Sequence, residues 1–451
     1  MQWDDREKIA RQSIGRSLVS LAVPAVTSTF FTVVFEIIDM YWIGKLEADS
    51  IAALSGASFF VWMVRGLGLT VAAGTIAMVS RRTGEKDEEG LLKVVSNAVA
   101  SAFVFALFIM VSLLIPALHV FKWVKLDPAV AVLAEEYTTV FLSGLIFVYM
   151  MMTVEFIIRG IGDTRTPMKL VGISLFLNAV LDPLFIFTFG MGLKGAAYAT
   201  ILSQCIGAVL LAVVLLKKIP QLKILRFDAA AGFFRDFWRQ FFSILKIGGP
   251  VGISDAGFSF IYVLLSGIIS IFGKEPLAAV GISHRLEALP FFICLGFSMA
   301  VEPMVGQFLG AGKAESARKS VYLSLKITTG IIFVIVVVYY LFAPQLYRVF
   351  TDDPAIIAHG VDYLRIVVLS EFFLVFEVVL TGAFSGAGDT RPPFLIVFPI
   401  TFSRVPLSYL FAVVFGYGAK AIWAMIGFTT FLKGLLLLNL FRKGRWAKKK
   451  I

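Results

Sequence analysis

The chain has little charge and almost no cysteine or histidine. Only 16% of its 451 residues are charged, and it holds two cysteines and three histidines. Cys205 and Cys294 both fall within apolar runs, so we expect small buried side chains rather than a disulfide or a metal pair. The chain also lacks a Walker motif, a nucleophile elbow and a His/Cys cluster, so ATP-driven transport, hydrolase chemistry and a zinc site are disfavoured. No cofactor is expected.

What the chain has in abundance is apolar residues, which make up 59% of it, with 44 phenylalanines. A soluble globular domain cannot bury that much apolar surface, so the composition predicts a polytopic membrane protein. Runs of spanning length recur at about residues 18–43, 51–78, 94–118, 131–157, 170–189, 195–216, 247–271, 277–304, 321–343, 355–384, 394–416 and 419–440. We therefore expect about twelve transmembrane helices. The first run is too long for a signal-peptide core.

The net charge of +11 has a topological explanation. If the N-terminus is cytoplasmic, most of the 41 lysine and arginine residues fall in segments on the cytoplasmic side, as the positive-inside rule requires. This asymmetry accounts for the charge without nucleic acid as a partner. The sequence thus predicts a multi-pass protein of the plasma (inner) membrane, in contact with membrane lipids, with both termini cytoplasmic.

An internal repeat divides the chain into two halves. GIGDTRTP begins at Gly160 and GAGDTRPP begins at Gly386, and we call the separation of these two glycines the repeat offset. The same offset joins Pro24 to Pro250. A duplicated unit of six helices places both copies in the same orientation, with a substrate site expected between them. We predict an all-α membrane protein with two pseudo-symmetric six-helix lobes, at residues 1–225 and 247–451, joined by a cytoplasmic linker at 226–246.

Two polar residues stand in the middle of an apolar run of the first half. Asn178 and Asp182 lie one helical turn apart, and Pro183 follows the acid and loosens the helix. A carboxylate in hydrocarbon costs about 2.5–3.5 kcal/mol, so Asp182 should face a protein interior or a water-filled cavity. We interpret the pair as part of an ion or proton site. The alternative is that both side chains only join helices by hydrogen bonds.

Further polar residues of the first half extend this cluster. Glu36 and Asp39 share a face of the first run, and Thr200 and Tyr137 are candidates to supply hydroxyl oxygens. The second half lacks the cluster, because the counterparts of Asp39, Asn178 and Asp182 at the repeat offset are Leu265, Arg404 and Ser408. An alkali cation would use these oxygens as ligands, whereas a proton would need only two close carboxylates. The sequence does not decide between an alkali cation and a proton as the bound ion.

The second half has its own charged residues within apolar runs. The acids are Asp255, Glu287, Glu302, Glu371 and Glu377, and the bases include Arg285, Arg365 and Arg404. Internal ion pairs and contacts with a substrate are both open for these residues.

These motifs together resemble those of the multidrug and toxic compound extrusion (MATE) family of secondary transporters. The resemblance rests on Pro24 with Asp39, on the block from Leu177 to Thr200, on the two GDTR junctions and on RRTGEKD at Arg81. It implies two six-helix lobes around a central cavity. It also implies a secondary active multidrug efflux antiporter, not an enzyme, that exports cationic or amphipathic small molecules in exchange for H⁺ or Na⁺.

The resemblance also implies roles for particular residues. The cation or proton would bind at Asp39, Asn178, Asp182 and Thr200, which are also the possible Na⁺ ligands, with Tyr137 in support. Pro24 would be a bend point in the first helix, and Asp255, Glu371 and Glu377 would contact the substrate or the ion. A monomer is expected.

Glu36 departs from the family pattern, because similar prokaryotic sequences often carry an amide there. This leaves the ion preference open. Two other functions remain possible at this stage. A flippase for lipid-linked oligosaccharides shares a related two-lobe architecture but would need a strongly basic cavity, and a membrane-embedded transferase would need a clustered aspartate motif inside a span.

Overall fold

The structure is a computed structural model that describes residues 13–123, 127–223, 231–449 and 451. These residues form helices and connecting turns and contain no strand. The helices of the first half are α3 (Ile14–Ile43), α4 (Ala48–Glu85), α5 (Glu88–Trp123), α6 (Pro128–Ser143), α7 (Leu145–Gly160), α8 (Arg165–Pro183), η1 (Leu184–Thr188), α9 (Leu193–Lys218) and η2 (Pro220–Lys223). Those of the second half are α10 (Ala231–Ser270), α11 (Lys274–Gly310), α12 (Ala314–Leu341), α13 (Ala343–Arg348), α14 (Pro354–Val367), η3 (Val368–Ser370), α15 (Glu371–Gly386), α16 (Arg391–Tyr409), η4 (Leu410–Val414), α17 (Ala419–Arg442) and η5 (Arg445–Lys448).

The described helices agree with the predicted number of spans. Eleven of them are long and apolar enough to cross a membrane, or twelve if the bent pair α6 and α7 is one span. This pair bends by 51° at the break between Ser143 and Leu145. The predicted linker, 226–246, lies partly outside the described residues, and its remaining part belongs to the long helix α10. The chain is therefore an all-α, multi-pass membrane protein.

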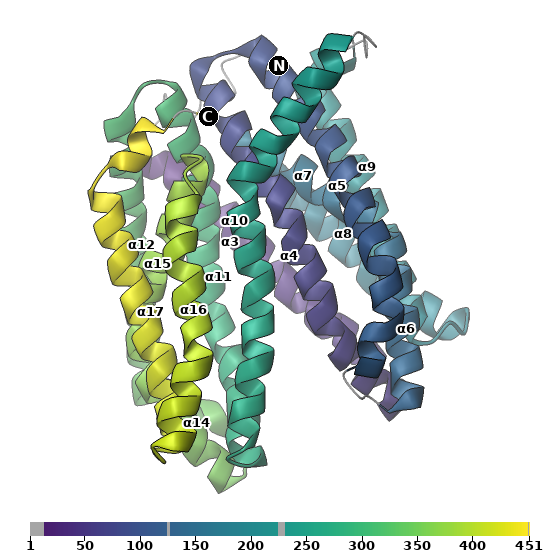
Figure 1. The fold of residues 1–451 in the computed structure, drawn as a ribbon, viewed down its shortest axis with the longest axis vertical. Helices are drawn as coiled ribbons and strands as arrows, with labels where there is room; N and C mark the ends of the chain where they lie inside the picture. The colour runs from purple at the N-terminus through teal and green to yellow at the C-terminus, as the bar shows by residue number, and fades with distance from the viewer. Residues whose placement is uncertain (1–12, 124–126, 224–230, 450) are drawn as a thin grey trace.

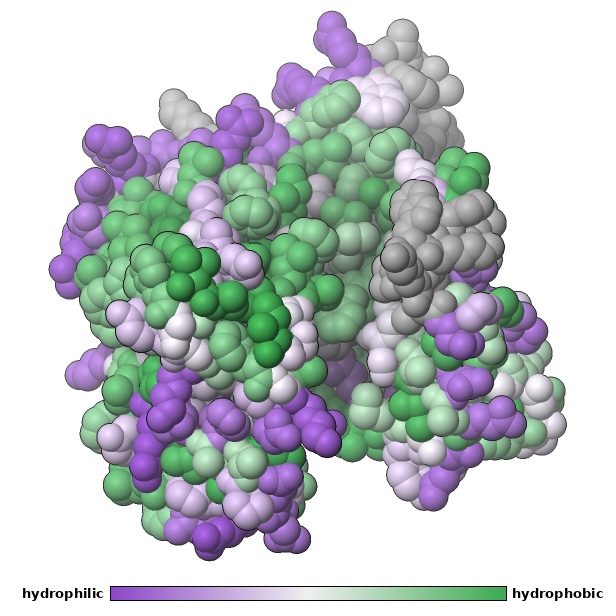
Figure 2. Space-filling model, turned by 60° about the horizontal axis from the view of Figure 1, so that its bottom comes forward, coloured by the Kyte–Doolittle hydropathy of each residue, from purple (hydrophilic) through white to green (hydrophobic). Residues whose placement is uncertain are grey.

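The two halves form two lobes. Figure 1 shows α4 to α9 on one side and α11 to α17 on the other, with α3 and α10 between them and both chain ends at the upper end. The helices of the two lobes are close together at this upper end and spread apart toward the lower end. In Figure 2 the lower end of the molecule is turned toward the viewer, and a recess is visible between the lobes. The predicted two-lobe architecture is confirmed.

The repeat is visible in hydrogen bonds as well as in sequence. The hydroxyl of Thr164 donates to the carbonyl of Leu21 at 3.1 Å, and the hydroxyl of Thr390 donates to the carbonyl of Ile247. Donors and acceptors of these two bonds are counterparts at the repeat offset. The threonine of each GDTR motif therefore ties its junction to the first helix of its own lobe.

The aspartate of the first GDTR motif holds the start of α8. Oδ1 of Asp163 accepts from the backbone N–H of Thr166 at 3.0 Å, and its other oxygen lies 2.8 Å from Nζ of Lys218. Partial burial raises the pKa of the Asp163 carboxyl, but the bonds from Lys218 and Thr166 outweigh it and leave the pKa below its ordinary value. The junction is therefore charged at neutral pH and fixed to the end of α9.

A π-helix and a glycine turn occur at corresponding positions in both halves. After Pro183 the chain continues as the π-helix η1, and the second half has its π-helix η4 at the corresponding position, where Tyr409 stands in place of the proline. Gly190 and Gly416 then end these segments with φ of 64° and 75°. A residue with a Cβ atom rarely adopts this φ, so glycine is needed at both turns.

Small residues bring the lobes into direct backbone contact. A Cβ atom added to Gly248 on α10 would lie 1.8 Å from the carbonyl oxygen of Thr70 on α4. One added to Gly74 would lie 2.2 Å from the carbonyl oxygen of Ile244. Without a hydrophobic driving force between helices in lipid, such close backbone packing is a main source of helix association. The crossing of α4 and α10 thus depends on these two glycines.

Two hydrogen bonds from α4 and α11 also cross between the lobes, each to a GDTR junction. The amide of Gln307 donates to the carbonyl of Gly160 at 2.8 Å, and Arg81 donates to the carbonyl of Ala387 at 3.5 Å. Arg81 and Gln307 are counterparts in the repeat, and each reaches across to the GDTR junction of the other lobe. The lobes are therefore joined near these junctions, at the upper end.

Gly248→Ala should destabilise the protein by about 1–3 kcal/mol, because its methyl group overlaps a backbone oxygen that cannot move independently. Gly249→Ala is a matched control at the next residue, since an added Cβ atom there has no atom within 4 Å. The control should be neutral or stabilising by up to about 1 kcal/mol. Thermal unfolding in detergent measures both, and equal melting temperatures would contradict the close crossing.

Candidate functional site

The first lobe brings two carboxyl groups together from α3 and α8. Asp39 and Asp182 lie within hydrogen-bonding reach of each other. Asp182 is only 1% exposed, and its Oδ2, like Oδ1 of Asp39, has no donor among the described residues. Ionised carboxylates are both acceptors and repel each other, so a proton or a cation between them would lower the energy of this approach. The sequence predicted these residues as a site but did not establish that they meet.

Asn178 completes the site from the same helix as Asp182. Its Nδ2 donates to Oδ1 of Asp182 at 3.1 Å, as the spacing of one helical turn predicts. Asn178 is buried as well. Its side-chain oxygen is a neutral ligand of the kind that an alkali cation accepts.

Three further residues lie around the carboxyl pair. Tyr137 on α6 is buried within electrostatic range of both acids. Glu36 is exposed on α3, one turn before Asp39. Arg65 on α4 was not predicted as a site residue, yet it lies within electrostatic range of both α3 acids. The signal that could have identified Arg65 from the sequence is its position as a single arginine inside an apolar run.

Thr200 and Pro24 were also predicted to take part in the site. The hydroxyl of Thr200 donates to the carbonyl of Ala196 in its own helix at 3.0 Å, which leaves the oxygen as an acceptor. This bond stays within α9 and does not reach the acids, so the role of Thr200 as a ligand stays a prediction. Pro24 is buried inside α3, which remains one continuous helix. Its role as a bend point also stays a prediction.

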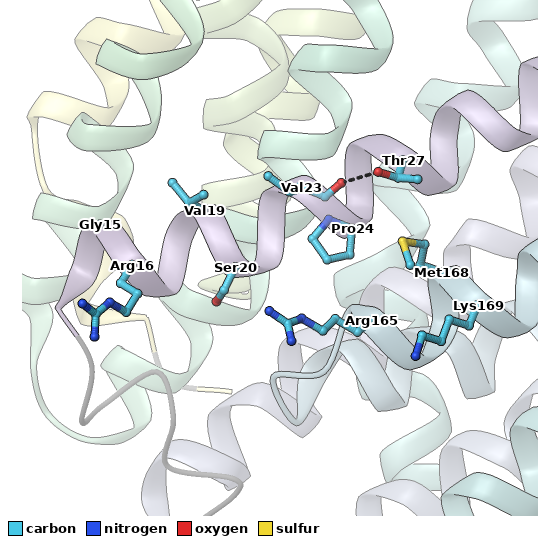
Figure 3. Close-up of a pocket in the computed structure, with 10 residues that line it drawn as sticks. All are labelled: Gly15, Arg16, Val19, Ser20, Val23, Pro24, Thr27, Arg165, Met168 and Lys169. Atoms are coloured by element: carbon cyan, nitrogen blue, oxygen red, sulfur yellow. Dashed lines mark hydrogen bonds between the residues drawn. The ribbon is translucent and has the colours of Figure 1, made fainter.

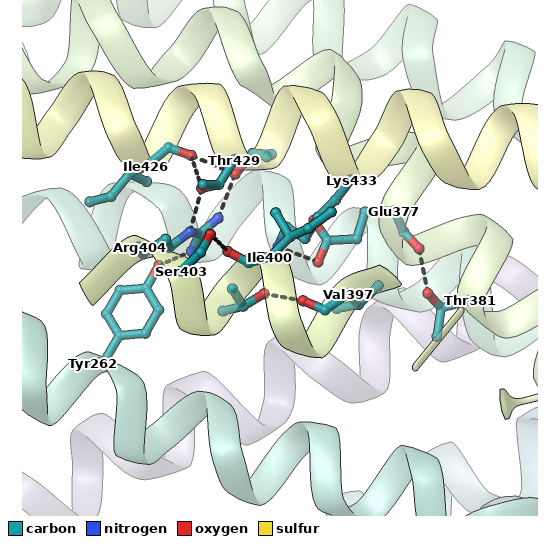
Figure 4. Close-up of polar contacts among 12 residues, drawn as sticks. Tyr262, Glu377, Thr381, Val397, Ile400, Ser403, Arg404, Ile426, Thr429 and Lys433 are labelled. Atoms are coloured by element: carbon teal, nitrogen blue, oxygen red, sulfur yellow. Dashed lines mark hydrogen bonds and ion pairs between the residues drawn. The ribbon is translucent and has the colours of Figure 1, made fainter. Parts of the chain in front are cut away.

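The corresponding place in the second lobe is filled by a side chain of the protein itself. The guanidinium of Arg404, the counterpart of Asn178, donates to Thr429 at 2.7 Å, to Thr430 at 2.7 Å and to Tyr262 at 3.1 Å (Figure 4). Tyr262 is the counterpart of Glu36. Arg404 is 2% exposed, and among the described residues no carboxylate lies within 4.0 Å of it. A cation held by neutral hydroxyls thus stands where the first lobe has open carboxylates.

The acids predicted to contact substrate fall into two groups. Glu377 forms an ion pair with the buried Lys433, with Oε1 2.6 Å from Nζ (Figure 4), so its charge is already compensated. Glu371 is buried, and its Oε2 has no partner among the described residues. Asp255 is exposed on α10 beside Gly66 of α4, where the lobes adjoin. Asp255 and Glu371 therefore have no ion-pair partner among the described residues, whereas Glu377 is paired.

A buried ion pair crosses between the lobes. Nη2 of Arg159 on α7 lies 3.5 Å from Oε2 of Glu302 on α11, and both residues are buried. Ser385 on α15 donates to the other oxygen of Glu302. The sequence showed these charges but not their pairing, because the two helices are far apart in the chain. The pair links the lobes near the GDTR junctions.

Arg404→Ala should destabilise the protein by about 2–4 kcal/mol, because three buried hydroxyls lose a charged donor. Free guanidinium at millimolar concentration should then restore part of the melting temperature by filling the vacated place, while NaCl at equal ionic strength should not. Asn178→Ala, at the counterpart position, should show no response to guanidinium. Equal effects of the two salts on Arg404→Ala would show that the cation site is not specific.

Comparison with known proteins agrees with this architecture. The MatE family model matches residues 24–184 and 250–410, two segments related by the repeat offset. The chain is 29% identical over 449 residues to a probable multidrug resistance protein NorM of Thermotoga maritima, covering 97% of this chain and 94% of that protein. It is 23% identical over 418 residues to the multidrug export protein MepA of Staphylococcus aureus, covering 92% and 91%.

Solved structures of similar fold extend over nearly the whole chain. The crystal structure of MATE in the bent conformation superposes with a TM-score of 0.88 at 24% identity, covering 98% of both chains. An outward-facing multidrug resistance MATE family transporter gives a TM-score of 0.87 at 23% identity, again over 98% of both. These likenesses support the two-lobe fold. Because the two matches to the family model together cover more than half of this chain, the chain belongs to the MatE family.

Proposed function

We propose that this chain is a secondary active antiporter that exports cationic or amphipathic small molecules in exchange for H⁺ or Na⁺. The observation that carries the proposal is the approach of Asp39 and Asp182, which creates a place for one positive charge inside the first lobe. The named functions of the relatives support multidrug export. The positive-inside pattern supports a plasma (inner) membrane location with both termini in the cytoplasm.

The carboxyl pair acts as a charge switch in this proposal. Without an ion, the two carboxylates repel each other in a partly dry site. Binding of H⁺ or Na⁺ removes the repulsion and draws α3 toward α8. Pro24 lowers the cost of a change in the angle of α3, because no backbone N–H donates to the carbonyl one turn earlier.

Only one lobe takes the exchangeable ion. Arg404 already supplies a positive charge at the corresponding place of the second lobe, and its three hydrogen bonds hold it there. The second lobe therefore offers a fixed environment to the substrate while the first lobe changes. Ion and drug are coupled because they favour opposite shapes of the first lobe, and the coupling is reciprocal.

The recess between the lobes is the proposed path of the substrate (Figure 2). Asp255 is exposed where α10 adjoins α4, so it is the acid best placed to attract an organic cation. Glu371 is a second candidate because one of its oxygens lacks a partner among the described residues. Glu377 contributes less, since Lys433 compensates its charge.

Asp39→Asn and Asp182→Asn should each abolish ion-driven export, because both changes preserve shape but remove the exchangeable charge. The measurement is efflux of a fluorescent organic cation from proteoliposomes under an imposed H⁺ or Na⁺ gradient. Asp49→Asn, an exposed acid at the start of α4, is the control and should transport normally. Gradient-driven export at the normal rate by either site variant would refute the proposal.

Asp255→Asn should reduce export of cationic substrates about tenfold or more, which corresponds to about 1.4 kcal/mol of lost attraction. Export of neutral or zwitterionic compounds should change little, because a carboxylate attracts them weakly. Transport rates for a matched series of charged and uncharged dyes measure the difference. An equal loss for all substrates would assign Asp255 to the coupling machinery instead.

A further inference from the structure

A groove between α3 and α8 lies outside the ion site and outside the recess between the lobes. It is a cavity of about 850 Å³, lined by residues of α3 between Gly15 and Thr27 and by Arg165, Met168 and Lys169 of α8. Figure 3 shows the α3 residues on one side and those of the first turns of α8 on the other. The groove therefore begins at the upper end of both helices and runs down past Pro24.

The upper part of the groove is positively charged and lacks a counter-charge in the described chain. Arg16 lies in the first turn of α3, Arg165 begins α8, and Lys169 follows one turn later. All three side chains are exposed, and no described carboxylate lies within 4.0 Å of any of them. Three cations around one cavity favour an anion with several oxygen atoms, such as a phosphate group.

The lower part of the groove is apolar. Val19 and Val23 are 46% and 59% exposed along α3. The hydroxyl of Thr27 does not offer a polar contact there, because it donates to the carbonyl of Val23 at 2.9 Å. Since α3 and α8 are both long and apolar enough to span a membrane, this exposed wall is suited to contact with acyl chains. A ligand with a phosphate at one end and hydrocarbon below it matches both parts, whereas free phosphate matches only the upper one.

The corresponding place of the second lobe is basic as well but carries its own carboxylates. The counterparts of Arg16, Arg165 and Lys169 at the repeat offset are Phe242, Arg391 and Leu395. A cavity there is lined by cations that include Arg391 and Lys449, but Asp389 also lines it and lies 3.3 Å from Lys449. The cations of the groove between α3 and α8 have no described carboxylate within 4.0 Å, so their charge is left for a ligand.

We propose that the groove between α3 and α8 binds an anionic phospholipid, with its phosphate at Arg16, Arg165 and Lys169 and an acyl chain along Val19 and Val23. The lipid joins the upper parts of the two helices whose lower parts carry Asp39 and Asp182. It also lies against Pro24, so its occupancy favours one angle of α3 over another. This inference does not require ion coupling and goes beyond the transport function.

Thermal unfolding of the full-length protein in detergent tests the proposal. Dioleoyl phosphatidylglycerol should raise the melting temperature by several degrees in a saturable way. Dioleoyl phosphatidylcholine and soluble glycerol phosphate, which lack the charge and the hydrocarbon respectively, should have little effect. Equal stabilisation by the two lipids would overturn a charge-selective site, and equal stabilisation by glycerol phosphate would show that the groove binds free phosphate instead.

Matched variants locate the lipid. The triple variant Arg16→Gln, Arg165→Gln, Lys169→Gln should lose most of the response to phosphatidylglycerol. The control triple variant Lys313→Gln, Lys319→Gln, Lys443→Gln removes the same charge from exposed residues near the upper end and should keep the response. If the triple groove variant does not fold, the single variants of both sets are compared instead. Each single groove variant should lose part of the response to phosphatidylglycerol, and each single control variant should lose none. Equal loss in the two sets would overturn the proposal.

The readout is independent of transport. Loss of ion-driven export in all preparations would leave the lipid response measurable, and loss of the lipid response would leave export measurable. The two proposals therefore fail separately.

Discussion

The architecture depends on the close backbone contact between α4 of the first lobe and α10 and α11 of the second. Glycine permits this approach, since a Cβ atom at Gly248 or Gly74 would overlap a carbonyl oxygen of the facing helix. In a bilayer such packing replaces the hydrophobic effect as the force between helices. Because these contacts are concentrated toward one end, the lobes spread at the other and leave the recess that Figure 2 shows. The position of the proposed substrate path follows from where the glycines lie.

Burial of charge in a membrane decides how the two copies of the repeat differ. The second lobe compensates two of its buried charges within the chain, with Lys433 against Glu377 and three hydroxyls around Arg404. The first lobe leaves oxygens of Asp39 and Asp182 without a donor among the described residues. A buried carboxylate without a partner is costly, so an external positive charge is the natural partner. The carboxyl pair of the first lobe is therefore the proposed place of the ion, whereas in the second lobe Glu371 is the buried acid that keeps an oxygen without a partner among the described residues.

The helices α3 and α8 carry two different features along their length. Their lower parts hold the carboxyl pair, and their upper parts enclose the groove with three cations. GDTR junctions fix the start of α8, because Asp163 accepts from Thr166 and Thr164 is bonded to α3. The same two helices therefore carry both features, with Pro24 between them on α3. This arrangement makes the α3–α8 pair the part of the first lobe most suited to respond to its surroundings.

Sequence alone determined the helices, the duplication and the polar cluster of the first lobe, because apolar runs, a fixed repeat offset and the spacing of Asn178 and Asp182 are one-dimensional signals. Resemblance to a known family added the roles of these residues. The tertiary structure decided which distant residues meet: Asp39 approaches Asp182, and Arg159 pairs with Glu302 across the lobes. Helix periodicity orders residues around one helix but contains nothing about the distance or rotation between two helices, which depend on packing of side chains from the whole chain. For that reason the polar residues of the first lobe were predictable from sequence, whereas their partners and the groove between α3 and α8 were not.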